Sequence, residues 1–159
     1  MRLLLHQQPV ARDLREISAA LTMISDMERI GDQAADIADL SKFIERSVVE
    51  IPDEIARMAE KTVHMVTESI DAFVKADLAL CRKVIDDDDL VDELFNQTKN
   101  KLADLIYKNM DAKAGLDLLM TAKYMERIGD HAVNIAEWVE YSITGIHRNN
   151  EHQMGGNKN

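Results

Sequence analysis

Four polar side chains recur one helical turn apart near the end of the sequence. The segment MERIGDHAVNIAEWVEY, residues 125–141, places Glu126, Asp130, Asn134 and Glu137 on one stripe of a helix. Like charges at this spacing repel by about 0.2–0.5 kcal/mol per pair on an isolated helix. We therefore expect this stripe to face groups or ions that offset the repulsion.

The same pattern occurs a second time, 98 residues earlier in the chain. The segment MERIGDQAADIAD, residues 27–39, places Glu28, Asp32 and Asp36 at the equivalent positions. The two long helices that carry these segments are therefore expected to be duplicates. Roughly seventy residues that precede the second copy have no counterpart before the first, so the first copy is expected to be truncated.

Further acidic residues interrupt the apolar face of a helix between the two copies. In VIDDDDLVDELF, residues 84–95, the spacing of Val84, Val91 and Phe95 gives Asp88 a position where an apolar residue is expected. Asp92 follows one turn later. A carboxylate at a core position needs a partner, because burying an unpaired charge is costly.

Antiparallel packing brings these residues together with the second copy of the motif. A short turn centred near residues 110 and 111 would join the two helices. Residues whose numbers sum to about 221 then lie at the same level, which places Asp130 beside position 91. Asp88 and Asp92 are then expected to face Asp130, Asn134 and Glu126. Converging carboxylates without a basic partner either keep protons at a raised pKa or bind cations. Oxygen ligands favour hard ions such as Mg²⁺, Mn²⁺, Ca²⁺ or iron.

A solvated acidic face is the alternative for either stripe, because Arg29 and Arg127 lie beside the acidic residues and can neutralise part of their charge. For the first copy, the residue that would lie level with Asp32 falls before Met1, so the helix that would face Asp32 is absent from this chain.

His131 is matched by Gln33 in the first copy and is expected to lie outside the ligand set. The sequence has no P-loop, nucleophile elbow, paired-cysteine motif or Glu-x-x-His motif.

The elements that must position these residues are expected to be helices. The 159 residues are 46% hydrophobic but only 4% aromatic, with 6 Gly and 2 Pro, a composition typical of an all-α protein. Helical spacing and breakers predict a first helix from Pro9 to about Val48, a second that Asp53 caps, a third from the KADLA link to Tyr107, and a fourth from Ala112 to Ile143 that ends near Gly145. Short links predict antiparallel neighbours.

Bulk properties exclude some partners. A formal net charge of −10 argues against nucleic acid, which needs a concentrated basic face. The single cysteine, Cys81, gives no sign of an oxidising compartment, so we expect an intracellular protein. No apolar run approaches the length of a membrane span or of a signal peptide's apolar region, so membrane contact is expected only through a partner.

With these residues laid out, the chain resembles the PhoU family of phosphate-uptake regulators. The resemblance rests on the two copies of Glu-Arg-Ile-Gly-Asp, at 28–32 and 126–130, on the HAVNIAE extension of the second copy, and on the DDLVD segment at 88–92. It implies an all-α antiparallel bundle built from two pseudo-symmetric three-helix units. Residues 1–50 would then be the remnant of a first repeat, residues 51–147 a complete second repeat, and residues 148–159 a disordered tail.

The resemblance also implies a function and a site. Family members are similar in being cytoplasmic, commonly dimeric negative regulators that link the ATP-binding subunit of a phosphate transporter to a phosphate-sensing histidine kinase. Residue matching implies metal-site roles for Asp88, Asp92, Glu126, Asp130 and Asn134, and less directly for Glu28, Asp32 and Asp36. The metal is expected to be iron, Zn, Mg or Mn. Asp36 departs from the family motif, which has asparagine there.

Two other functions are weighed beside the regulator. A carboxylate-bridged metalloenzyme would use the cluster to activate water or oxygen, but the sequence offers no evident base or histidine ligand for it. A metal-free helical interaction module would leave both acidic stripes without a ligand. In every case the long first helix has few neighbours to cover its apolar residues, so we expect the chain to self-associate as a homodimer through these helices.

Overall fold

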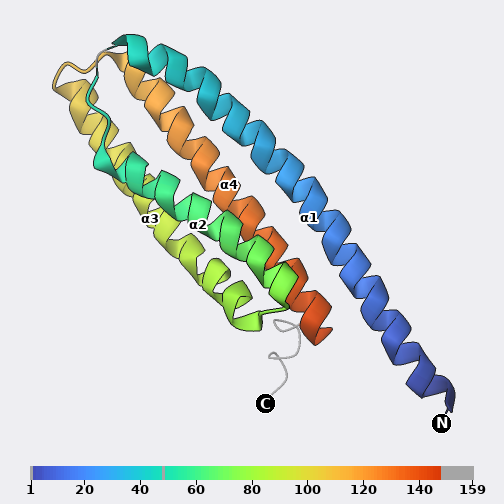
Figure 1. Ribbon diagram of the computed structural model, residues 1–159. Helices are drawn as coiled ribbons and strands as arrows, with labels where there is room; N and C mark the ends of the chain where they lie inside the picture. The colour runs from blue at the N-terminus through green and yellow to red at the C-terminus, as the bar shows by residue number, and fades with distance from the viewer. Residues whose placement is uncertain (1, 48, 148–159) are drawn as a thin grey trace, which may run out of the picture.

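Four α-helices and one short 3₁₀ helix make up the part of the protein that the computed structural model describes, residues 2–47 and 49–147 (Figure 1). They are α1 (Arg2–Ile44), the 3₁₀ helix η1 (Glu45–Ser47), α2 (Asp53–Lys75), α3 (Leu78–Tyr107) and α4 (Ala112–Thr144). Those residues contain no strand, which confirms the predicted all-α class. The predicted tail at 148–159 lies outside the described residues.

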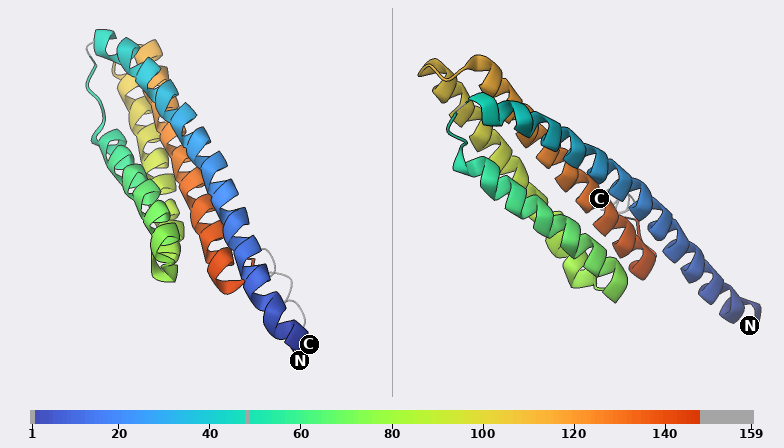
Figure 2. Two further views of the ribbon diagram at one scale, coloured as in Figure 1. Left: turned by 45° about the vertical axis from the view of Figure 1, so that its right-hand side comes forward. Right: turned by 45° about the horizontal axis from the view of Figure 1, so that its top comes forward.

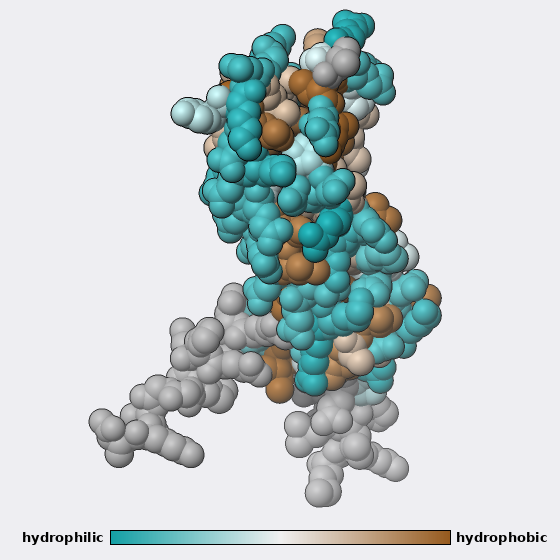
Figure 3. All heavy atoms as spheres, turned by 90° about the vertical axis from the view of Figure 1, so that its left-hand side faces the viewer, coloured by the Kyte–Doolittle hydropathy of each residue, from teal (hydrophilic) through white to brown (hydrophobic). Residues whose placement is uncertain are grey.

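The helices form an antiparallel bundle with α4 at its centre. Helices α2, α3 and α4 pack together as a three-helix unit, and α1 lies along the opposite side of α4 (Figures 1 and 2). The contacts of α1 with α2 and α3 are marginal, so α4 alone joins α1 to the rest of the described chain. The surface on the side away from α1 is mostly hydrophilic, with scattered hydrophobic patches (Figure 3).

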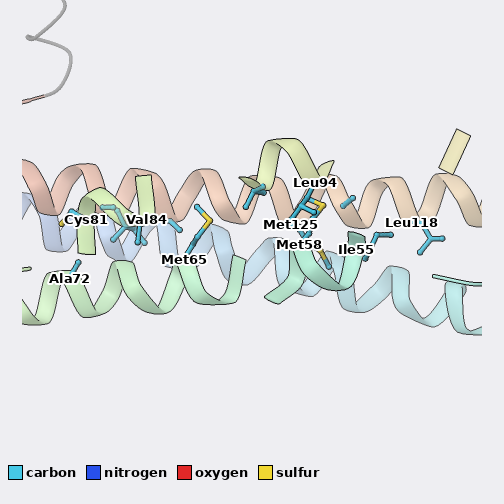
Figure 4. Packing of buried hydrophobic residues seen from close by; sticks show 14 of the residues in the cluster. Ile55, Met58, Met65, Ala72, Cys81, Val84, Leu94, Leu118 and Met125 are labelled. Carbon is cyan, nitrogen blue, oxygen red and sulfur yellow. The ribbon is translucent and has the colours of Figure 1, made fainter. Parts of the chain in front are cut away.

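The core lies where α2, α3 and α4 meet (Figure 4). Its fully buried side chains include two methionines, Met58 and Met65, together with Val84, Leu118 and Ile135. The flexible methionine side chain suits such positions because it fills irregular gaps between helices. No helix in residues 2–47 and 49–147 combines the length and apolar character needed to cross a membrane.

Local sequence explains the turns between helices. The α2–α3 link passes through Ala76 with φ of 49°, and the Asp77 side chain then accepts a 3.1 Å hydrogen bond from the Leu80 backbone N–H. Asp111 accepts a 2.9 Å bond from the Ala114 N–H in the same way at the start of α4. Gly145, with φ of 72°, ends α4 as predicted, because glycine adopts this conformation without strain.

Two predicted boundaries are wrong. Helix α1 begins at Arg2 and continues through Pro9, which was expected to mark its start. Pro9 is the eighth residue of the helix, past the first turn where proline is best tolerated, so α1 continues there without one of its backbone hydrogen bonds. Asp53 is the first residue of α2 and not its cap, since Pro52 holds the cap position and makes no side-chain cap bond. Asp53 and Glu54 in the first turn still interact favourably with the helix dipole.

Leucines two positions apart on α4 provide a test of the core. Leu118 is 1% exposed and Leu116 is 59% exposed. Leu118→Ala is expected to lower the free energy of unfolding by about 2–5 kcal/mol, because it removes buried apolar volume and leaves a cavity. Leu116→Ala is the matched control and should change it by about 0.5 kcal/mol or less. Equal losses in urea denaturation would contradict the assigned packing of α4.

Candidate acidic metal centre

Asp88 lies where α3 crosses the second motif copy on α4. A Cβ atom built on Gly129 would be 3.7 Å from Val91 Cγ1 and 3.8 Å from Asp88 Oδ1, so residues 129 and 91 lie level as the antiparallel geometry predicts. These distances are ordinary van der Waals contacts, so packing here does not require glycine. Asp88 is half-buried at a position that otherwise continues the apolar face of α3.

Four carboxylates converge at this crossing. The pKa of Asp88 is raised from its ordinary value of 3.8 to about 6. Burial is the largest cause, and the charges of Asp92 and Asp130 come next. Desolvation followed by the charge of Glu126 raises the pKa of Asp92 and of Asp130, although both lie at the exposed rim. The negative charges nearby thus disfavour ionisation of Asp88, Asp92 and Asp130, as is typical of a shared acidic site.

His131 lowers the pKa of Asp130, and a second basic side chain, Lys123 of α4, pairs with one of the four carboxylates. Its Nζ lies 2.6 Å from Glu126 Oε2, and its charge lowers the pKa of Asp92 and Asp130 against the stronger effects that raise them. Asp88 Oδ1 is buried without a hydrogen-bond partner. A buried acceptor in this state calls for a proton, a water molecule or a cation. Sequence reasoning missed Lys123 and considered the neighbouring arginine instead.

The donor set suits a hard cation, since every converging ligand atom is a carboxylate oxygen. In the arrangement described for residues 2–47 and 49–147, however, no three His, Cys, Asp or Glu side chains are placed so that they hold a metal ion. Glu126 would have to leave Lys123, and the aspartates would have to turn toward one another. The ligand atoms are therefore of the right chemical type for a metal ion. The side chains would have to rotate before these atoms could surround one.

Asn134 contacts α1 instead of the acidic cluster. Its Nδ2 donates a 2.6 Å hydrogen bond to Oδ2 of Asp26, while Oδ1 of Asp26 lies 3.0 Å from His131 Nδ1. Asp26 is only 2% exposed, so this group, which we call the Asp26 clasp, is a buried polar link between α1 and α4. Asp26 was not predicted, although it interrupts the apolar spacing of Ala19, Met23 and Ile30 as Asp88 interrupts that of α3.

The first motif copy has no equivalent surroundings. Glu28, Asp32 and Asp36 are all exposed on α1, on a helix that neither α2 nor α3 covers. A Cβ on Gly31 would meet no atom within 4 Å, so no close approach occurs there in the described chain. The structure thus brings together Asp88, Asp92, Glu126 and Asp130, and separates Asn134 and the first copy from them.

The arginines considered as neutralising groups lie away from this cluster. Arg29 and Arg127 are exposed, and in the described part of the chain neither forms an ion pair. The Arg127 guanidinium lies 5.7 Å from the centre of the Tyr124 ring. His64 is exposed on α2. Ion pairs with these arginines therefore do not hold the acidic residues of the second copy.

Comparison with known proteins gives one consistent match. A family model described as the PhoU domain matches residues 1–41 and 55–139. A "phosphate-specific transport system accessory protein PhoU homolog" of Clostridium acetobutylicum is 37% identical over 148 residues, which are 91% of this chain and 68% of that protein. A homologue of the same description in Methanothermobacter thermautotrophicus is 34% identical, over 87% of this chain and 64% of its own length.

Solved structures agree with this match. The crystal structure of PhoU from Pseudomonas aeruginosa superposes with a TM-score of 0.81 at 32% identity, over 91% of this chain and 71% of that one. The phosphate transport system regulatory protein PhoU from Streptococcus pneumoniae, at 23% identity and a TM-score of 0.77, supports the fold. The chain thus spans about two thirds of the length of the proteins it matches.

The raised pKa of Asp88 predicts how stability changes with pH. The folded chain holds this proton more tightly than the unfolded chain, so stability falls as pH rises from 3.8 to about 6 and stays lowered above that. In metal-free buffer Asp88→Asn should therefore be more stable than wild type by about 1–2 kcal/mol at about pH 7, after allowance for solvent screening, and equal to it at about pH 4.

Urea denaturation across this pH range measures the effect. Asp86→Asn, on the exposed side of the same helix, is the control and should follow wild type at every pH. A destabilised Asp88→Asn protein above the folded pKa would show that the carboxylate is favourably partnered and would contradict the assigned repulsion.

The Asp26 clasp predicts a second stability difference. Asp26→Ala leaves the Asn134 amide and the His131 ring without their acceptor and should cost about 1–3 kcal/mol in the free energy of unfolding. Backbone amide hydrogen exchange should accelerate more in α1 than in α2 or α3. The reason is that the clasp joins α1 to α4 and contains no residue of the other two helices. Asp13→Ala, an exposed change on the same helix, is the control. Uniform acceleration in all helices would contradict this local role.

Proposed function

This chain belongs to the PhoU family, and we propose that it acts as a regulator of phosphate uptake and not as an enzyme. The relatives are named as accessory or regulatory proteins of phosphate-specific transport. The observation that carries the proposal is a buried, unpartnered oxygen of Asp88, whose pKa the charges of Asp92, Asp130 and Glu126 help to raise. The names of the relatives, which describe accessory and regulatory proteins, support binding and switching over catalysis at this site.

The acidic cluster is the metal-binding part of this regulator. Asp88, Asp92, Glu126 and Asp130 would hold the ion through carboxylate oxygens, and iron, Zn, Mg or Mn is the expected metal. A bound cation would supply positive charge that lowers the pKa of these groups and joins α3 to α4. Glu28, Asp32 and Asp36 offer similar oxygens, but a site there needs ligands from outside α1.

The regulator works as an adaptor in the cytoplasm. Its proposed partners are the ATP-binding subunit of a phosphate transporter and a phosphate-sensing histidine kinase, with the chain itself acting as a homodimer. A net charge of −10 favours docking on basic protein surfaces, and nucleic acid is not a proposed partner. The chain would reach the membrane by binding the transporter, without inserting into the bilayer.

Metal binding can be tested on paired motif variants. Calorimetric titration of chelator-treated protein with Mn²⁺ should give a binding isotherm that Asp88→Asn with Asp130→Asn weakens by at least about tenfold, because two of four ligands lose their charge. Asp32→Asn with Asp36→Asn makes the same charge change in the first copy and is the matched control. Unchanged Mn²⁺ affinity in the Asp88/Asp130 variant would refute the site.

The adaptor role needs a separate measurement. The full chain should be retained by an immobilised transporter ATP-binding subunit, and a chelator or the Asp88/Asp130 variant should weaken this retention. Retention that ignores both changes would separate docking from the metal site. Absence of retention under all conditions would contradict the proposed partner.

A further inference from the structure

Lys123 of α4 contacts two groups at the edge of the acidic cluster. Its Nζ lies 2.6 Å from Oε2 of Glu126 on the same helix and 5.2 Å from the centre of the Phe95 ring on α3. The carboxylate pairs with the ammonium group, and the ring face attracts it. The side chain of Lys123 is 40% exposed and that of Glu126 is 17% exposed, so the ammonium group contacts solvent while the carboxylate is largely covered.

We propose that Lys123 is the internal counter-cation of this cluster: its ammonium group holds Glu126 in the free protein, and a divalent cation that binds the carboxylates displaces it. This inference rests on the metal site proposed above and adds the regulation of that site. It is supported by the orientation of the ion pair, by the reach of the lysine charge, and by the positions of the carboxylates.

The order of the two residues indicates that the surroundings, and not the helix, favour this ion pair. A glutamate that precedes a lysine on a helix gives a better pair than the reverse order, and here Lys123 comes three residues before Glu126. A lysine side chain also loses rotamer entropy when it is held in one position. The negative charges of the neighbouring carboxylates offset both disadvantages by attracting the ammonium group.

The charge of Lys123 acts on carboxylates beyond its ion-pair partner. It lowers the pKa of Asp92 on α3 and of Asp130 on α4, against the burial and the negative charges that raise both. His131 also lowers the pKa of Asp130, but its Nδ1 lies 3.0 Å from Asp26 at the seam with α1. One ammonium group cannot balance four carboxylates, so the cluster keeps an attraction for further positive charge.

The ion pair accounts for one ligand that the cation site lacks. In the part of the chain that the structure describes, no three acidic, histidine or cysteine side chains are placed to hold a metal ion, and Glu126 is held by Lys123. Oδ1 of Asp88 is buried without a hydrogen-bond partner. A divalent cation carries twice the charge of an ammonium group and binds several carboxylate oxygens at once. Release of Glu126 from Lys123 and binding of the cation are therefore one linked equilibrium.

Removal of the lysine charge tests this competition. In calorimetric titration with Mn²⁺, Lys123→Met should bind at least about fivefold more tightly than wild type, because the cation no longer has to displace an ammonium group. Lys123→Arg keeps the positive charge and should stay within about twofold of the wild-type affinity.

Lys99→Met is the matched control. Lys99 lies 5.8 Å from the centre of the same Phe95 ring, but in the described residues it forms no ion pair. At about 0.15 M salt, where distant charges are screened, its loss should change the Mn²⁺ affinity by less than about twofold.

Stability in metal-free buffer distinguishes a counter-cation from a residue that only supports packing. Without metal, Lys123→Met should unfold at a lower urea concentration than wild type, because the carboxylates then repel one another with less compensation. The same variant should bind Mn²⁺ more tightly. Loss of both stability and affinity would contradict the counter-cation role, because a packing residue would produce that result.

Chemical modification follows the lysine in the unaltered chain. Acetylation of Lys123 by an N-hydroxysuccinimide ester, measured by mass spectrometry, should become faster when saturating Mn²⁺ is added, because release from Glu126 exposes Nζ. Acetylation of Lys99 is the internal control and should keep its rate.

The possible failures are distinguishable. If neither wild type nor Lys123→Met binds Mn²⁺, the metal site is wrong and the role of Lys123 is wrong with it. If wild type binds Mn²⁺ but Lys123→Met binds it equally or more weakly, the metal site stands and the counter-cation role alone is overturned. An acetylation rate of Lys123 that ignores bound Mn²⁺ has the same meaning.

Discussion

Burial of α4 on two opposite sides is the constraint on which the rest of the structure depends. Helices α2 and α3 cover one side of α4 and α1 covers the other, so the helix has no broad polar face left. Several of its polar residues lie along the two seams where neighbours meet. Glu126 and Asp130 lie at the seam with α3, and His131 and Asn134 lie at the seam with α1. A short motif therefore serves two interfaces at once: it supplies the acidic cluster on one side and the Asp26 clasp on the other.

The duplicated motif shows how far surroundings decide what a sequence does. Both copies place glutamate and aspartate one turn apart on long helices, yet only the second copy meets a facing helix in the described chain. Around Asp130, burial and neighbouring carboxylates raise the pKa. Around Asp32 the same residue type is exposed on a helix surface. The charge pattern alone does not make a site, because a converging set needs a second backbone to present it.

Much of this arrangement was predictable from the sequence, and the failures have identifiable causes. Helical spacing and turn residues predicted the helices and the level of α3 against α4, because these depend on local chemistry and a short link. The start of α1 was predicted wrongly because Pro9 was read as a helix breaker, whereas a proline removes only its own backbone hydrogen bond and this long helix continues through it. Asp26 was missed because its partners lie more than a hundred positions away, and only the packing of α1 on α4 reveals them.

The attachment of α1 gives the molecule a mechanical asymmetry. Arg15 lies beside Gly145 at the end of α4, so the residues before Arg15 project past the bundle (Figure 1). The Asp26 clasp lies about 24 Å from Val10 along the axis of this rod. A tilt of about 10° at that pivot would displace the projecting tip by about 4 Å. The projecting end of α1 is therefore the part of the molecule where a small change in the tilt of this helix would produce the largest displacement.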